Sequence, residues 1–164
     1  MTVGFDQFND PLKAIKAQSR SSQTPYISAN IFATETGAPL FNAYRLVTID
    51  GLSIAIIGLT EPYPFKERQG MNVSGIYFMD PYKAAKELAP ILEPYADILI
   101  ASVHKSSTQV RPSALESIPS LDLVMELQPE PQNQPTLTRV DLEFLNGKLF
   151  VLNQKTFEIL ELTH

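Results

Sequence analysis

The sequence contains no cysteine in 164 residues. This absence excludes a disulfide framework, a thiolate nucleophile and a cysteine-ligated metal centre. No run of Lys and Arg is present either, and the formal net charge is −5. Non-specific nucleic-acid binding requires a basic surface, so we expect no nucleic-acid partner.

Long apolar segments are also missing. The first 20 residues contain no apolar core of a secretory signal, and the longest apolar stretch, LSIAIIGL, is too short to span a bilayer. Hydrophobic residues make up 44% of the chain and charged residues 19%, a composition typical of a globular protein. We expect one domain over residues 1–164, no membrane partner and, by default, a cytoplasmic location.

Capping and turn signals predict the order of helices and strands. Asp10-Pro11 and Asp80-Pro81 each join a capping residue to a proline suited to the first helical position, which predicts helices over 10–20 and 80–95. The segment PYISANI, residues 25–31, is predicted to form a strand. A long irregular stretch, 60–79, is typical of a loop that lies over a site.

Two tight turns predict β-hairpins, one at Asp50-Gly51 and one at Asn146-Gly147. After the first turn, 54–59 is apolar without alternation, as expected for a strand covered on both faces. Helices and strands then alternate through strands at 97–103 and 121–127, which predicts parallel pairing. The fold class is therefore α/β (α+β): mixed sheets flanked by helices, ending in an antiparallel hairpin.

His104 is the most prominent candidate for chemistry. It ends the apolar run DILIASVH and is one of two histidines in the chain. The nearby serines suggest a serine hydrolase, but the chain has no Gly-x-Ser-x-Gly elbow, and no acid is evidently placed to orient the imidazole. The second histidine, His164, is the last residue and is expected to fray.

The run PYISANIFATETGAPLFNAYRLVTIDGLSIAIIGLTEP resembles the metallophosphoesterase (calcineurin-like) domain of the 5'-nucleotidase and UDP-sugar hydrolase family. In that family a Pro-x-x-Ser-Ala-Asn strand precedes a hairpin and a Gly-Leu-Thr ending, here 25–30 and 58–60. ADILIASVHKSS is similar to the family strand that ends in a metal-binding histidine. The resemblance covers roughly the second half of the family's domain, so we expect a partial, truncated domain.

The resemblance implies a centre of two metal ions (Mn, Mg or Zn), for which this chain keeps few ligands. The family's Gly-Asn-His-Glu-Phe-Asp stretch aligns with GFDQFN, which puts Phe5, Asp6 and Gln7 in place of the metal-binding Asn, the catalytic His and the Glu. The family's Gly-His-x-His pair aligns with Gln128 and Glu130. Three residues could still assemble an improvised metal site: His104, Asp6 and Glu130.

Two functions stay open. The chain is either a degenerate or truncated relative without autonomous catalysis, or a metal-dependent phosphoesterase acting on nucleotides or related phosphate esters. The second function needs ligands from another chain or an improvised site, because two metals require several converging ligands. If the domain lacks its first strands, a sheet edge is uncovered, so we expect self-association or a partner chain there.

Overall fold

The computed structural model describes residues 1–4, 6–62, 73–105, 114–127, 136–145 and 148–158. At residues 6, 127, 136–140, 148 and 154–158 it describes only the backbone. Two compact units divide the chain, Met1–Gln128 and Pro129–His164. The expectation of one domain over 1–164 stays a prediction. The elements in chain order are η1 (Asp6–Asn9), α1 (Leu12–Ser21), β1 (Ile31–Ala33), β2 (Tyr44–Ile49), β3 (Leu52–Thr60), β4 (Ile76–Phe78), α2 (Pro81–Leu92), η3 (Glu93–Tyr95), β5 (Ile98–His104), η4 (Ala114–Ser117), β6 (Leu123–Leu127), β7 (Thr136–Leu145) and β8 (Lys148–Glu158).

The hairpin predicted at Asp50-Gly51 is confirmed. Strands β2 and β3 pair antiparallel along their whole shared length, from Tyr44 opposite Ile57 to Ile49 opposite Leu52. Asp50 and Gly51 have φ angles of 50° and 84°. Two consecutive positive φ angles give a turn whose twist matches that of the strands, and glycine adopts such an angle without steric cost.

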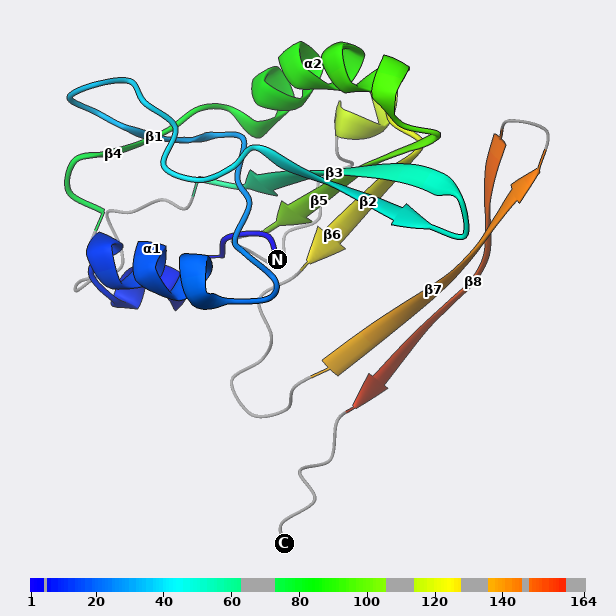
Figure 1. Ribbon diagram of the computed structural model, residues 1–164, viewed down its shortest axis with the longest axis horizontal. Helices are drawn as coiled ribbons and strands as arrows, with labels where there is room; N and C mark the ends of the chain where they lie inside the picture. Colours follow the sequence, from blue (N-terminus) through cyan, green and yellow to red (C-terminus); the bar gives the residue numbers. More distant parts are fainter. Residues whose placement is uncertain (5, 63–72, 106–113, 128–135, 146–147, 159–164) are drawn as a thin grey trace, which may run out of the picture. The chain divides into compact units, whose positions relative to one another are not determined.

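The predicted parallel pairing is confirmed in a four-stranded sheet of order β2-β3-β5-β6. Strands β3, β5 and β6 run parallel, so Thr60, His104 and Leu127 stand in register at their carboxyl ends. Strand β2 pairs antiparallel with β3 and forms one edge. The mixed sheet agrees with the predicted fold class, and Figure 1 shows α2 and α1 on opposite sides of it.

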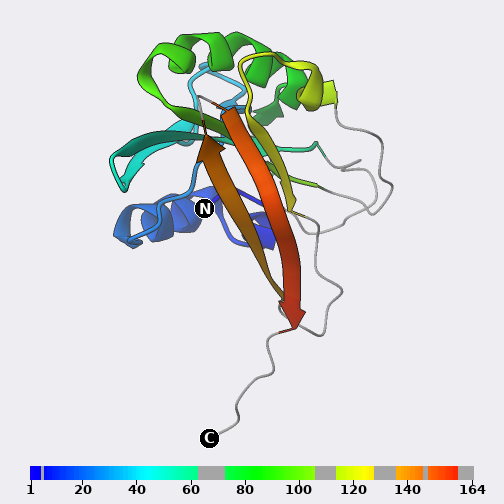
Figure 2. The same cartoon turned by 90° about the vertical axis from the view of Figure 1, so that its right-hand side faces the viewer.

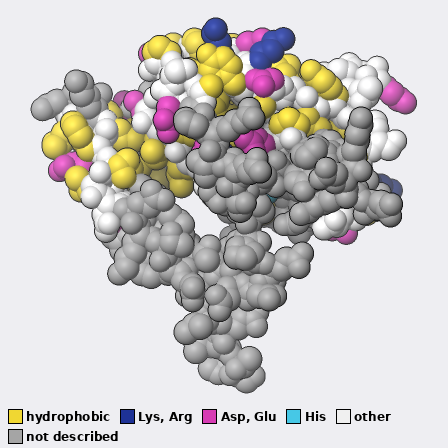
Figure 3. All heavy atoms as spheres, turned by 180° about the vertical axis from the view of Figure 1, so that it is seen from behind, with side chains coloured by type: hydrophobic (Ala, Val, Ile, Leu, Met, Phe, Trp, Pro, Cys, Tyr) yellow, Lys and Arg dark blue, Asp and Glu magenta, His cyan; other side chains and the backbone are white. Residues whose placement is uncertain are grey.

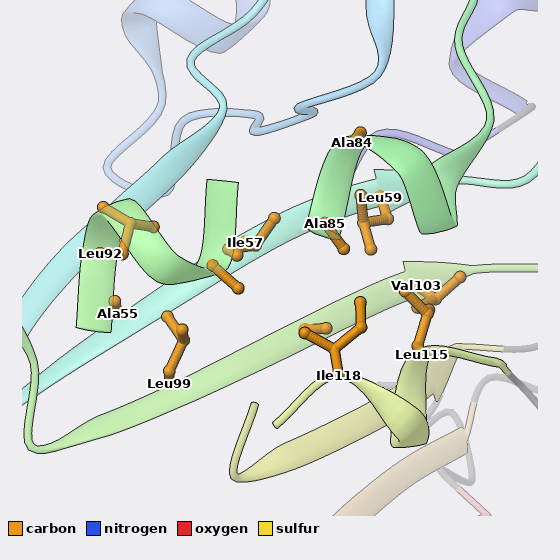
Figure 4. Packing of buried hydrophobic residues seen from close by; sticks show 12 residues of the cluster. Ala55, Ile57, Leu59, Ala84, Ala85, Leu92, Leu99, Val103, Leu115 and Ile118 are labelled. Atoms are coloured by element: carbon orange, nitrogen blue, oxygen red, sulfur yellow. The ribbon is translucent and has the colours of Figure 1, made fainter. Parts of the chain in front are cut away.

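Helix α2 covers one face of this sheet and builds the main core. Asp80 caps the helix as predicted, because its carboxylate accepts a hydrogen bond from the Lys83 N–H at 2.8 Å, and Pro81 opens the first turn. Small side chains at 84, 85 and 89 let the helix approach the strands closely. Figure 4 shows the resulting layer, which comprises Ala55, Ile57, Leu59, Ala84, Ala85, Ala89, Leu92, Leu99, Ala101, Val103, Leu115 and Ile118.

A second apolar cluster lies around α1, and Figure 2 shows this helix below the sheet from another side. Ile15 is buried in it, as the amphipathic pattern of the helix requires. The predicted start of the helix is wrong. Helix α1 begins at Leu12, and Pro11 precedes it with an extended ψ of 142°. Asp10 therefore lies outside the helix and does not cap it.

The predicted strand over 25–31 is also wrong, since β1 begins only at Ile31. Before β1, consecutive backbone N–H groups donate to different segments. The Ser28 N–H donates to the Asn42 carbonyl at 2.8 Å, and the Ala29 N–H donates to the Gly58 carbonyl at 2.7 Å. Two different partner segments prevent one continuous ladder. Strand β1 instead pairs antiparallel with β4, which lies in the stretch predicted to be irregular; residues 63–72 of that stretch lie outside the described residues.

The second unit is the predicted antiparallel hairpin. Strands β7 and β8 pair from Thr136 opposite Glu158 to Leu145 opposite Lys148, with a register shift between Asp141 and Leu142. The predicted turn at 146–147 lies outside the described residues. Figure 3 shows apolar side chains exposed at several places on one face of the molecule. None of the described helices is long and apolar enough to cross a membrane.

Candidate functional site

His104 ends β5 at the carboxyl edge of the parallel strands, as predicted. Its side chain is half-buried, and its carbonyl accepts a hydrogen bond from the Glu61 N–H at 2.9 Å. Thr60 and Leu127 flank it in the ladder. Side chains from several strands converge at such an edge of a parallel sheet, which makes it the usual place for a ligand site in α/β folds.

The amino-terminal segment meets the imidazole of His104. A Cβ atom built on Gly4 would lie 2.6 Å from Cε1, 2.7 Å from Nε2 and 2.9 Å from Nδ1 of His104. Real Cβ atoms do not approach other atoms this closely, so the ring lies directly on the Gly4 backbone. The structure therefore brings Gly4 into contact with the residue that ends β5.

The side chain of Gln7 is engaged within that segment. Its Oε1 atom accepts a hydrogen bond from the Gly4 N–H at 2.6 Å. Phe8 is fully buried, and its ring meets that of Phe78 edge-on, with centroids 5.8 Å apart. Gln7 and Phe8 thus fix the segment against the rest of the unit, and Gln7 keeps Gly4 in place under the imidazole.

Ser28 and Asn30 form a closed hydrogen-bond network with Thr60, and all three are fully buried. The Asn30 amide donates to the carbonyls of Thr60 at 2.7 Å and Met79 at 2.9 Å, while its oxygen accepts from the Thr60 N–H at 2.9 Å. The Thr60 hydroxyl donates to the Val3 carbonyl at 2.8 Å. These bonds give Ser28 and Asn30 a structural role, because they tie this segment to the ends of β3 and β4.

An ion pair that the sequence did not predict lies at the same edge of the sheet as His104. Lys105 Nζ lies 2.8 Å from Glu126 Oε1, and the two side chains are 5% and 24% exposed. Lys105 directly follows β5, while Glu126 lies within the next parallel strand. The signal in the sequence was Glu126, the one acid within the strand sequence LVMEL, which becomes informative only when the register with β5 is known.

The other predicted ligands are not tested. The side chain of Asp6 and the whole of Gln128, Glu130 and His164 lie outside the described residues. Within the described part of the chain, no group of three or more His, Asp or Glu side chains is placed to hold a metal ion. Metal binding by His104 with Asp6 and Glu130 stays a prediction.

The fold is that of the calcineurin-like metallophosphoesterases. A calcineurin-like phosphoesterase of Bacillus subtilis, YfkN, superposes with a TM-score of 0.65 and 16% identity, covering 96% of this chain and 62% of that one. A provisionally assigned 5'-nucleotidase of Staphylococcus aureus gives a TM-score of 0.76 and 18% identity, covering 99% of this chain and 38% of that one. No protein-family model matches the sequence.

The sequence is related to that of the 5'-nucleotidases. It is 33% identical to a 5'-nucleotidase of Vibrio cholerae over 111 residues, which are 66% of this chain and 20% of that protein. It is 32% identical to the UshA protein of Salmonella pullorum over 106 residues, 63% of this chain and 19% of that one. The chain therefore spans about a fifth of the length of these relatives.

Proposed function

We propose that this chain is a non-catalytic relative of the 5'-nucleotidases, a metallophosphoesterase scaffold that assembles no complete two-metal centre from its own residues. The packing of His104 on Gly4, beside an engaged Gln7, carries the proposal. One imidazole at the end of β5 remains of the ligand set that the family uses. In this view His104 is a remnant of a metal site, and the chain is a pseudoenzyme.

The described residues around His104 do not fit a two-metal centre. Such a centre needs several anionic or imidazole ligands converging on ions about 4 Å apart. Gln7 is a neutral amide whose oxygen already accepts the Gly4 N–H. Glu126 is paired with Lys105 and stands opposite Val103 in the ladder, so its side chain extends from the other face of the sheet than that of His104. Neither side chain is available as a ligand in this arrangement.

The alternative is a metal-dependent phosphoesterase acting on nucleotides or related phosphate esters. Its support is the 33% identity to a protein named 5'-nucleotidase and the histidine at the expected strand end. This function requires Asp6 and Glu130 to join His104, or ligands from another chain. Both functions predict the same fold, so only a measurement of metal binding and turnover separates them.

The test is a manganese titration followed by NMR, with hydrolysis of 4-nitrophenyl phosphate and AMP assayed on the same sample. The chain has two histidines, so a His164→Ala variant assigns the imidazole signals and serves as the matched control. Paramagnetic Mn²⁺ selectively broadens the signals of a bound imidazole. We expect no selective broadening of His104 and no turnover that depends on it. Saturable broadening at His104, together with hydrolysis lost in His104→Ala but kept in His164→Ala, would establish the enzyme instead.

We also propose that the β2 edge of the sheet pairs with a second copy of this chain. Among the described strands, β2 has one sheet neighbour, β3. Strand β2 also exposes three large apolar side chains: Tyr44 (39%), Leu46 (49%) and Ile49 (56%). An edge with free backbone groups and apolar side chains is a template for strand pairing. A twofold axis lets two copies use the same edge, which is the commonest symmetry of dimers.

Sedimentation velocity tests this pairing. We expect a dimer in the unmodified protein and a monomer in Leu46→Lys, because a lysine places charge on the shared edge. Ile91→Lys is the matched control, since Ile91 is a similarly exposed apolar residue (62%) on α2. A monomer at all concentrations in the unmodified protein, or a dimer that survives Leu46→Lys, contradicts the proposal.

A further inference from the structure

A groove of about 480 Å³ lies beside α1, lined by that helix, the turn that follows it and the segment before β2. Its volume falls in the range of about 300–1,000 Å³ that small-molecule sites occupy. The floor consists of Tyr26, Leu40 and Phe41, which belong to the second apolar cluster and are 6–9% exposed. The groove is formed by residues other than those around His104.

Hydrogen bonds fix the walls of the groove. The hydroxyl of Ser19, in α1, accepts the Tyr26 N–H at 2.8 Å in a buried position. On the opposite wall, the Leu40 N–H donates to the Ile31 carbonyl at 3.0 Å, and the Asn42 carbonyl accepts the Ser28 N–H at 2.8 Å. Because these bonds join backbone to well-buried partners, the groove has its shape before any ligand arrives, which lowers the entropic cost of binding.

The groove carries positive charge on an otherwise acidic protein. Lys16 and Arg20 lie one helical turn apart on α1 and both line it, whereas none of the described residues that line it is acidic. No ion pair between described residues involves either side chain. The net charge of the whole chain is −5, so this local excess of cations is the reverse of the average surface. Arg20 also lies in the last turn of α1, where a cation offsets the helix dipole; Lys16 lies outside that turn.

We propose that this groove binds a small organic anion, in which a phosphate or carboxylate is held by Arg20 and Lys16 and a compact apolar body rests on the floor. The guanidinium group of Arg can donate two parallel N–H bonds to two oxygens of either a phosphate or a carboxylate, and the ammonium group of Lys adds a second positive charge. Asn42 and Ser22, at the rim, offer neutral donors and acceptors for further polar atoms of the ligand. The site is independent of any metal at His104.

The test is a ¹⁵N NMR titration of the full chain with three probes: phenylphosphonate, benzoate and inorganic phosphate. We expect saturable shifts of the amides at 16–22 and 39–42 with at least one organic probe. The double variant Lys16→Ala/Arg20→Ala is expected to weaken that binding about tenfold or more, because it removes the charge-assisted bonds. Lys13→Ala is the matched control, an exposed lysine on the same helix that does not line the groove.

Each outcome decides the proposal. Preference for phenylphosphonate or for benzoate supports it and identifies the head group. Inorganic phosphate binding as tightly as both organic probes contradicts the role of the apolar floor. The absence of saturable shifts with every probe, or equal weakening in Lys13→Ala and in the double variant, overturns the site. Circular dichroism on each variant confirms that the exposed substitutions leave the fold intact.

Discussion

Two sets of polar side chains lie at the carboxyl edge of the parallel strands, and they differ in charge and in burial. Ser28, Asn30 and Thr60 are neutral and fully buried. Their neighbours His104, Lys105 and Glu126 are ionisable, and only Lys105 is buried. The first set is a closed network that joins 28–30 to the ends of β3 and β4. The second set includes His104, for which the family resemblance predicts a metal-ligand position.

One edge of the sheet thus combines a neutral, buried hydrogen-bond network with a group of ionisable side chains. A neutral network in a dry interior is rigid when all its members are bonded, and among the described residues every buried side-chain nitrogen or oxygen has a partner. The ionisable set carries charge, which is costly to bury and is retained only when paired. Residues such as Asn30 therefore hold the edge of the sheet together, whereas His104 and its ionisable neighbours lie outside this neutral network.

Of the substitutions considered, Asn30→Ala is expected to destabilise the fold most, because it disrupts the neutral hydrogen-bond network of Ser28, Asn30 and Thr60. The change removes four hydrogen bonds and leaves two carbonyls, the Thr60 N–H and the Ser28 hydroxyl without that partner. We expect a loss of about 3–5 kcal/mol in the free energy of unfolding, measured by urea denaturation. Asn42→Ala is the control, because the Asn42 side chain is exposed. Equal effects of the two variants would show that the network is dispensable.

Glu126→Ala should break the ionisable set with an effect of about 3 kcal/mol, since it leaves the buried Lys105 without its carboxylate. Lys105→Met should cost less, because Glu126 is partly exposed and regains water. The double variant Lys105→Met/Glu126→Leu is expected to recover part of the loss. Urea unfolding of all three measures this asymmetry; a larger loss in Lys105→Met than in Glu126→Ala would refute it.

Gly4→Ala tests the ionisable set directly, because the added methyl group displaces the side chain of His104. The new methyl group would meet three ring atoms of His104 within 3 Å, so the imidazole must move. We expect a loss of about 1–2 kcal/mol in unfolding free energy and a clear change in the imidazole NMR signals of His104. The signals of His164 serve as the internal reference. An unchanged His104 spectrum would mean that the ring does not rest on Gly4.

Ser28→Ala is expected to have the smallest effect. The Ser28 hydroxyl bonds Asn30 Oδ1 at 3.2 Å and lies 3.3 Å from the Thr60 hydroxyl, and both partners keep shorter bonds elsewhere. The expected loss is about 1 kcal/mol by urea denaturation. A loss as large as that of Asn30→Ala would show that the network acts as one cooperative unit.

Local signals in the sequence predicted much of the fold and part of the site. Asp50-Gly51 and Asp80-Pro81 gave the hairpin and α2, because turn and cap chemistry depends on adjacent residues. The strand predicted at 25–31 failed because its backbone bonds go to distant segments. The Lys105–Glu126 pair was missed for the same reason, since only the strand register brings the two side chains together.

The strand order also indicates in which order the strands pair as the chain folds. β2 and β3 are neighbours in sequence and share a two-residue turn, so their pairing closes a very short loop and forms in about 1–10 μs. Strands β3 and β5 are separated by β4 and α2, and their parallel ladder requires the closure of a long loop. We infer that the hairpin nucleates folding and that the edge carrying His104 assembles last, so substitutions there chiefly accelerate unfolding.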